Sequence, residues 1–530
     1  MSLTGWIKRR TFSPPKNLLG ADLFWWQETG DLHTLISIHA PDIPAADAPK
    51  INLTFVLFDR AGVPRTSWQR NVLADETIVI DSALVHRTAD DADLPEEGTL
   101  AAFVSSEQPV EDRVARDYHR LYSLVDWYSD AGELVSLHND QSVTAHDAAI
   151  EFTEIAFLET DRDKNFLVII NGNKPQTADS ISLTIKNHRG ETRTARYRPA
   201  MKPYSLHKLH LAELFPDLRD FCGDQHACLS GEFKCRGLFV RPYVMTRGSH
   251  LSGYHGGDRY ASMKGLSRSR YEQLGHGEVN PMAIVNTDKV QTFVNIFNTH
   301  GSIEDDFWVD ARVYDEKGTL IADKPRWVLA TRNQLARGDV AELLPAADRP
   351  MIGHIALSFS PDDKPFYPGR LQALLEYRTE HNTARVMAWS DEWNSTERQE
   401  GAAPVLRAFY RMWFKRSIVS SLSITNSGLS PDYDKHVEYT IRLRNTDGDT
   451  LTYQGKLAPQ ATDFGTIDTF FPGIEDFLDG APAAMAVVES TSDLAIVQFS
   501  NHQESGVFSA EHFMALNTYH DGDFHLPCGS

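Results

Sequence analysis

The chain has 530 residues, with 52 basic and 73 acidic side chains, which give a formal net charge of −21 at pH 7. That balance disfavours binding to nucleic acid, because a phosphate backbone would be repelled. Apolar runs such as Phe166 to Ile170 are strand-sized and far too short to span a membrane, and the sequence shows no export signal, so we expect a soluble cytoplasmic protein.

Four hairpins recur along the chain at nearly constant spacing. In each, an alternating apolar strand leads into a four-residue turn that begins with Asp or Asn and ends with Gly. The Asp or Asn side chain can accept a backbone hydrogen bond from two residues on, and Gly supplies the positive φ that closes the turn. The turn starts lie 128, 128 and 130 residues apart. The turns are Asp59 to Gly62, Asn187 to Gly190, Asp315 to Gly318 and Asn445 to Gly448.

Two further landmarks accompany these hairpins. An apolar strand that ends in His or Asn precedes each of them, at His39, Asn171, Asn298 and Asn426. A short motif follows three of them and predicts a helical plug of one or two turns, at Phe215-Pro216, Leu344-Pro345 and Phe471-Pro472. The first repeat lacks this motif, and a helical stretch near Val110 to Leu121 is predicted as an insertion in it.

The landmarks predict an all-β fold of four tandem immunoglobulin-like β-sandwich repeats, packed against one another, with short helical plugs. Each repeat is expected to hold about six or seven strands. The links contain apolar and aromatic residues instead of Gly/Ser spacers, which favours packed neighbours. We expect an N-terminal segment at 1–30, a divergent repeat 1 at 31–145, repeat 2 with an elaborated polar loop at 146–285, repeat 3 at 286–415, and repeat 4 with a tail at 416–530.

Signatures of common enzymes are missing from the sequence. It contains no nucleophile elbow, no phosphate loop, no dinucleotide-binding G-x-G-x-x-G after a strand and no H-E-x-x-H zinc motif. We therefore expect a non-catalytic interaction or scaffold protein. Its expected partner is a protein or a small ligand, and a transition metal is the one cofactor to consider.

A histidine beside a small or amide residue recurs in the final hairpin of each repeat. These residues are His138, His255, His381 and His502, at spacings of 117, 126 and 121 residues. If the repeats surround a common axis, four equivalent imidazoles converge there and form a site that suits iron, copper or zinc. The alternative is that His and Asn occupy exposed hairpin turns, as they commonly do.

The densest polar stretch of the chain lies in repeat 2. Its candidate ligand-binding residues are Arg247, His250, Tyr254, His255, Asp258 and Arg259. Two adjacent glycines allow close backbone approach, and Asp258 could orient an imidazole or a ligand. One alternative function is therefore a metal-dependent enzyme or metal-binding protein with a site at the repeat junction, centred on His255 and Asp258. The competing interpretation is that this polar stretch is a loop that docks onto a neighbouring repeat.

Trp389 and Trp393 form the last candidate site. They stand beside Asp391 and Asn394, and a mixture of exposed rings with carboxylate and amide groups suits a glycan. A second alternative function is therefore glycan binding. The competing interpretation is that each Trp fills a core or a domain junction.

Overall fold

The computed structural model describes most of the chain. The residues outside the described part are 1–6, 10–14, 41–49, 74–75, 89–93, 109–121, 139–148, 235–236, 239–241, 256–265, 268–278, 300–304, 346–349, 361–365, 368–371, 390–405, 414–416, 429–432, 446–448, 479–480, 482, 491, 493, 513–515 and 518–530. The predicted insertion near Val110 to Leu121 therefore lies outside it. No helix in the described part is long and apolar enough to cross a membrane.

Each repeat is a sandwich of two antiparallel sheets built from eight strands. With the strands of a repeat numbered 1 to 8, the outer sheet has the order 4-3-6-1 and the inner sheet the order 5-2-7-8. In repeat 2 these strands are β10 (Ala149–Phe157), β11 (Lys164–Ile170), β12 (Ile181–Lys186), β13 (Thr192–Tyr197), β14 (Leu206–His210), β15 (Ala227–Lys234), β16 (Tyr243–Arg247) and β17 (Leu251–His255).

Repeats 3 and 4 repeat this order strand for strand. Repeat 3 consists of β19 (Val279–Asn286), β20 (Gln291–Asn298), β21 (Phe307–Asp315), β22 (Leu320–Ala330), β23 (Gln334–Asp339), β24 (Met351–Phe359), β26 (Gln372–Arg378) and β27 (Thr383–Trp389). Repeat 4 consists of β28 (Leu406–Trp413), β29 (Ile418–Thr425), β30 (Val437–Arg444), β31 (Thr450–Leu457), β32 (Thr462–Thr466), β33 (Ala483–Ser490), β34 (Ala495–His502) and β35 (Phe508–His512). Short additional pairs are β18 (Leu266–Ser267) with β25 (Phe366–Tyr367), and β36 (Leu516–Asn517) with β28.

Repeat 1 has the same eight strands, but its two sheets are joined. Strands 1 and 2 of this repeat pair with each other as well as with their own sheets, through Glu28 with His33 and Thr29 with Leu32. Its strands are β2 (Leu18–Thr29), β3 (Leu32–His39), β4 (Ile51–Asp59), β5 (Pro64–Val72), β6 (Thr77–Asp81), β7 (Glu97–Ser106), β8 (Tyr122–Tyr128) and β9 (Leu134–His138), with β1 (Ile7–Arg9) added beside β5.

The predicted all-β fold of four packed sandwich repeats is confirmed, with differences in detail. Each repeat has eight strands where six or seven were expected. The strand order also differs from the ABED and CFG sheets of an immunoglobulin constant domain, so the likeness extends to the sandwich architecture and not to the order. The first strand of repeats 1, 3 and 4 lies before the expected start of that repeat, at β2, β19 and β28. These strands carry none of the landmarks.

The recurring turns at Asp59, Asn187 and Asp315 form as expected, and the first and third also join neighbouring repeats. Residues 446–448 of the fourth turn lie outside the described part of the chain. Asp59 Oδ1 accepts hydrogen bonds from the backbone N–H of Ala61 and Val63, both at 2.9 Å, and Gly62 has a φ of 80°. A methyl group at Gly62 would overlap the carbonyl oxygen of Pro203 in repeat 2. In repeat 3, Gly318 has a φ of 81° and faces the carbonyl oxygen of Pro459 in the same way. The turn glycine therefore allows both the turn and its docking onto the next repeat.

In repeats 3 and 4, the Asn that follows or ends strand 2 links the segment before strand 3 to the end of strand 4. Asn298 Nδ2 donates to the carbonyl of Ala330 at 2.7 Å and to that of Asp305 at 2.9 Å. Asn426 Nδ2 donates in the same way to the carbonyls of Lys435 and Ala458. An amide with two N–H donors satisfies two backbone carbonyls at one open end of the sandwich, which gives a reason for the recurrence of this residue.

Short helices close the sandwiches between strands 5 and 6, where plugs were predicted. They are α3 (Leu211–Leu214) and α4 (Leu218–Cys222) in repeat 2, η2 (Val340–Glu342) in repeat 3, and α6 (Ile467–Phe470) and α7 (Ile474–Leu478) in repeat 4. Repeat 1 has α1 (Ser82–Thr88) at the same place in the strand order, although its sequence lacks the motif.

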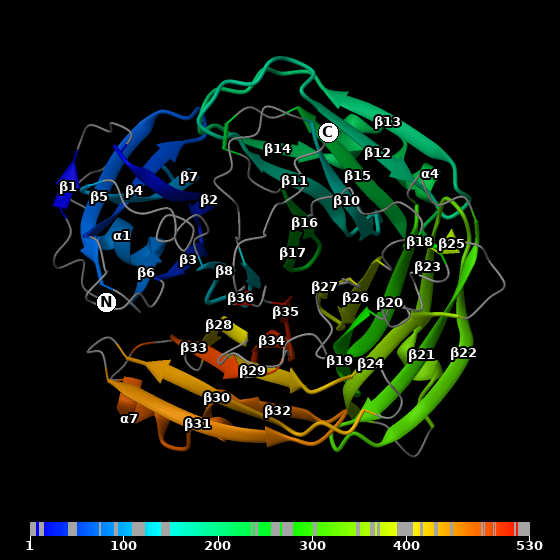
Figure 1. The fold of residues 1–530 in the computed structure, drawn as a ribbon. Helices are drawn as coiled ribbons and strands as arrows, with labels where there is room; N and C mark the ends of the chain where they lie inside the picture. The colour runs from blue at the N-terminus through cyan, green and yellow to red at the C-terminus, as the bar shows by residue number, and fades with distance from the viewer. Residues whose placement is uncertain are drawn as a thin grey trace.

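The four repeats close into a ring, with the outer sheets facing outward and the inner sheets toward a common axis (Figure 1). The eighth strands meet at this axis: β9 contacts β17 and β35, and β27 contacts the same two strands. Apolar clusters cross the seams between repeats. One cluster joins Trp127 of repeat 1 to Tyr243 of repeat 2, and another joins Tyr377 of repeat 3 to Phe499 of repeat 4.

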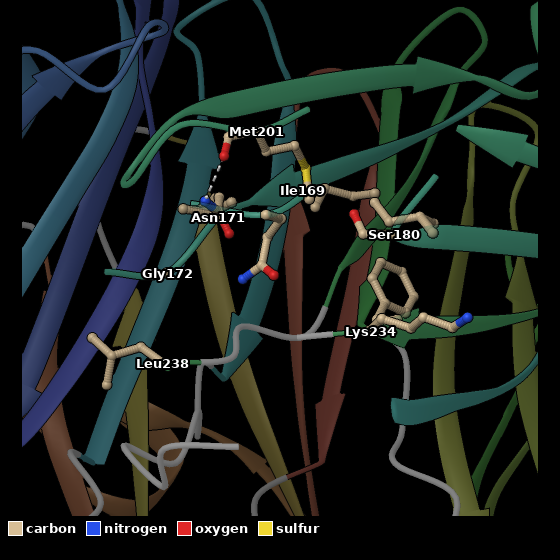
Figure 2. Close-up of a pocket in the computed structure, with 11 residues that line it drawn as sticks. Ile169, Asn171, Gly172, Ser180, Met201, Lys234 and Leu238 are labelled. Carbon is tan, nitrogen blue, oxygen red and sulfur yellow. Dashed lines mark hydrogen bonds between the residues drawn. The ribbon is translucent and has the colours of Figure 1, made fainter. Parts of the chain in front are cut away.

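Outside the axis, the sandwich of repeat 2 has a small cavity at one end (Figure 2). It encloses about 310 Å³, part of it open to solvent, between Ile169, Met201 and Leu238. Asn171 lines this cavity and donates to the carbonyl of Met201, so its amide already has a structural role.

Candidate metal centre

Three histidines end the eighth strands of repeats 1, 2 and 4. Strands β9, β17 and β35 are each five residues long, and their last residues are His138, His255 and His512. Alternation along a strand places first, third and fifth side chains on one face, so the same position in equivalent strands points the same way. Because the three strands lie side by side at the axis, the three imidazoles converge.

The imidazoles are close together and buried. The ring centroids of His138 and His255 are 4.2 Å apart, those of His138 and His512 are 5.0 Å apart, and those of His255 and His512 are 5.4 Å apart. The exposed fraction is 1% for His138 and His255 and 9% for His512. Burial of three aromatic bases on one axis is unusual for residues that ordinarily prefer partial exposure.

Glu511 completes the cluster with a carboxylate. Its Oε1 lies 2.7 Å from His138 Nδ1 and 3.7 Å from His512 Nδ1, and its Oε2 accepts the backbone N–H of His138 at 3.1 Å. Glu511 is 2% exposed. Burial raises the pKa of Glu511 to about 8, and the adjacent His512 offsets only part of that effect. A second positive charge beside this carboxylate would favour its ionised form.

The four side chains offer one oxygen and three nitrogen donors within 4.8 Å of one another. Zinc binds His nitrogen and carboxylate oxygen at about 2.0–2.2 Å, so donors of a tetrahedral site stand about 3.4 Å apart. A donor pair at the 4.8 Å limit would have to close by about 1.4 Å, which lies within the range of side-chain rotation. The donor set fits a divalent first-row transition metal, since imidazole suits Zn, Cu, Fe and Ni.

The predicted convergence of four histidines holds for two of them. His138 and His255 meet, but His381 and His502 lie at the other end of the eighth strands, in or beside the turns that precede them. His502 Nδ1 there accepts the backbone N–H of Ser505 at 3.2 Å. The assignment of His381 and His502 to the cluster is therefore wrong, and the cluster contains Glu511 and His512 instead.

Sequence reasoning missed Glu511 and His512, although a signal for them existed. The strands read Leu134-Val-Ser-Leu-His138, Leu251-Ser-Gly-Tyr-His255 and Phe508-Ser-Ala-Glu-His512, each with an apolar residue four positions before the His. The three histidines align when residues are counted from the start of each strand, because each is then the fifth residue. They do not align when residues are counted from the turn. The same count reaches Met387 in β27, so repeat 3 adds no histidine to the cluster.

The predicted ligand-binding residues of repeat 2 separate in the structure. Arg247 and His250 lie at the turn end of the axis, where Arg247 Nη1 pairs with Glu133 Oε1 of repeat 1 at 2.6 Å. The ring of His250 is 6.2 Å from that of His381. Tyr254 is 1% exposed and stacks on His255, so it belongs to the core.

The remaining predicted residues fall at or beyond the limits of the described chain. Asp258, Arg259 and Trp393 lie outside the described residues. Trp389 is the last residue of β27, and its backbone pairs with Gln372.

The comparisons with known proteins place this chain in no family. No family model matches it, and no curated protein matches it. Among solved structures, a crystal structure of a tetra-tandem repeat in the extending region of a large adhesion protein aligns with 94% of this chain and 100% of its own, at 11% identity. The TM-score of that alignment is 0.10, so the likeness carries no argument about fold or function.

Proposed function

We propose that this chain is a non-catalytic ring scaffold that binds one divalent first-row transition-metal ion, such as Zn²⁺, on its axis. The observation that supports the proposal is the buried convergence of His138, His255, His512 and Glu511 from three repeats. An ionised carboxylate that is buried beside imidazole nitrogens needs a neighbouring positive charge, and a metal ion bound by these donors supplies it.

The donor set favours a structural over a catalytic metal. Structural zinc sites fill all four positions with protein ligands, whereas catalytic sites keep one position open for water or substrate. Here four protein donors are available, and each is buried. No open position is needed to complete a tetrahedron.

The place of the cluster gives the metal a mechanical role. The chain joins each of repeats 2, 3 and 4 to the repeat before it. Repeat 4 also contacts repeat 1, and no covalent connection crosses that seam. The pair of Glu511 with His138 crosses this seam over 373 residues of sequence. A metal bound by His138, Glu511 and His512 would fasten the seam, and His255 would anchor it to repeat 2.

Metal analysis of the purified full chain tests the proposal. The protein is stripped with a chelator, loaded with Zn²⁺ or Co²⁺ and freed of excess metal. We expect about one ion per chain and, for Co²⁺, the visible absorption of a tetrahedral site. His255→Ala and His512→Ala should lose the ion. His381→Ala and His250→Ala, which remove half-buried histidines at the other end of the axis, should keep it.

Two results would count against the proposal. One is a folded wild-type chain that retains no metal after loading. The other is equal loss of metal in all four variants, because that outcome would show adventitious binding by histidine in general.

A further inference from the structure

A second unusual site lies at the seam between repeats 2 and 3. The carboxylate of Glu376 in β26 is completely buried, with an exposed fraction of 0%. Its Oε1 pairs with Arg337 at 2.8 Å and Arg378 at 3.0 Å, and its Oε2 lies 3.4 Å from Arg385. His226 of repeat 2 approaches Oε2 at 3.3 Å. One carboxylate thus faces three guanidinium groups.

The surroundings of Glu376 carry more positive than negative charge. Burial alone would raise the pKa of Glu376, but the hydrogen bond from His226 and the charges of Arg385 and Arg337 hold it well below its usual range. Burial lowers the pKa of His226 and of Arg337, and Arg378 contributes to the lowering at Arg337. The nearby carboxylate of Asp339 is committed to the backbone N–H of Ala341. With Asp339 counted, three arginines still outnumber two carboxylates.

Phe293 holds two of the arginines in a fixed orientation. The Cζ atom of Arg337 lies 3.6 Å from the centroid of the Phe293 ring, and that of Arg378 lies 5.2 Å from it. A guanidinium that stacks on a ring keeps its N–H edges free to point sideways, and such a fork matches a planar or tetrahedral oxyanion. Within the described part of the chain, Arg337 Nε is buried and has no hydrogen-bond partner.

The two arginines are also reachable from solvent. The side chain of Arg337 is 26% exposed and that of Arg378 is 37% exposed, whereas Arg385 is 7% exposed. Arg385 and Glu376 therefore form the buried floor, and Arg337 and Arg378 form the accessible rim.

We propose that Arg337 and Arg378 bind a small oxyanion, such as a phosphate group, at the rim of the seam between repeats 2 and 3. Glu376 and Arg385 keep the two guanidinium groups in place, and the bound anion balances the remaining positive charge. This site uses different residues and a different seam from the metal cluster.

Isothermal titration of the full chain with inorganic phosphate tests the site. The buffer contains no other oxyanion, and sodium chloride at matched ionic strength serves as the blank, because general screening affects every charged surface. We expect saturable binding with a Kd of about 1 mM or tighter. Loss of one charge-assisted hydrogen bond in Arg378→Gln should raise the Kd about tenfold or more.

A matched control separates this site from charge in general. Arg332→Gln removes one exposed arginine from the same repeat, away from Glu376, and should leave the Kd unchanged. Arg378→Lys keeps the charge without the fork and should fall between wild type and Arg378→Gln. The proposal is overturned if the wild type shows no saturable binding up to about 20 mM phosphate, or if Arg332→Gln weakens binding as much as Arg378→Gln.

Discussion

Arg411 of repeat 4 and Asp126 of repeat 1 form an ion pair across the seam that closes the ring. Both side chains are 2% exposed, and 285 residues separate them in the sequence. Arg411 Nε also donates to Ser37 Oγ at 2.8 Å, and Nη2 donates to the carbonyl of Leu124 at 2.7 Å. Trp413 Nε1 donates to the same carboxylate at 2.6 Å. The seam without a chain connection therefore contains a buried arginine of repeat 4 that donates to Ser37, Leu124 and Asp126 of repeat 1.

Removal of one partner of this pair should destabilise the closed ring. Asp126→Asn leaves Arg411 buried without a counter-charge, and breaking a buried pair costs about 3–5 kcal/mol. Chemical denaturation followed by tryptophan fluorescence measures the loss. Arg65→Gln breaks the exposed pair of Arg65 and Asp59 and should cost about 1 kcal/mol or less. Equal losses in both variants would contradict a special role for the seam.

The turn glycines should differ in their tolerance of a methyl group. Gly318 and Gly473 both have a φ of 81°, but a methyl group at Gly318 would overlap Pro459 of the next repeat, whereas nothing lies within 4 Å of that position at Gly473. Gly473→Ala should cost about 1 kcal/mol from backbone strain alone. Gly318→Ala should cost at least about 2 kcal/mol more, since the docked repeat must shift. Comparable melting temperatures in the two variants would argue against docking through this turn.

The recurring turns also show what the sequence could predict. The turn signal of Asp59 and its counterparts comes from neighbouring residues in the sequence. The four hairpins, their spacing and the all-β fold could therefore be predicted from the sequence alone. The first strands of repeats 1, 3 and 4 could not be predicted, because β2, β19 and β28 carry no local landmark. α1 was missed for the same reason: its place is set by the sandwich it closes and not by a Pro motif.

The site was harder to predict because the turns before the eighth strands differ in length. Three residues separate the paired residues Arg247 and Leu251, and six separate Asn501 and Phe508. Histidines at the same distance from turns of different length therefore lie at different heights along the axis. His512 is recognisable only after the strands are set in register, which requires the contacts among the four repeats.

Stability should fall as the pH falls from 7 toward 5, partly through His354. This residue is fully buried, stacks on Tyr314, and lies 3.3 Å from Thr462 Oγ1. Burial lowers its pKa from 6.5 to about 3. Below pH 6.5 the unfolded chain therefore binds a proton that the folded chain does not, and the difference grows until about pH 3.

One such histidine accounts for about 2 kcal/mol of unfolding free energy between pH 7 and pH 5. Denaturation curves at the two pH values measure the total change, and His354→Gln should reduce it by about that amount. A pH dependence that is the same in His354→Gln and wild type would contradict a lowered pKa of His354 in the folded protein.

Chelation should loosen the axis more than the outer sheets. If the metal fastens the seam, its removal should lower the melting temperature by about 2–4 °C. Amide exchange should rise in β9 and β35, where Ser136 N–H donates to Ser509 Oγ at 2.9 Å across the seam. Exchange in β12 and β30 of the outer sheets should change little. If amide exchange rises uniformly along the chain, or does not rise at all, the metal does not fasten the seam.

The most direct test of the metal centre is X-ray absorption spectroscopy of the zinc-loaded full chain. We expect four nitrogen or oxygen donors at about 2.0–2.1 Å, with multiple scattering from three imidazoles. His512→Ala should remove one imidazole from that signal or prevent loading. A shell that contains sulfur, or six oxygen donors without imidazole, would contradict the assignment of His138, His255, His512 and Glu511 as the ligands.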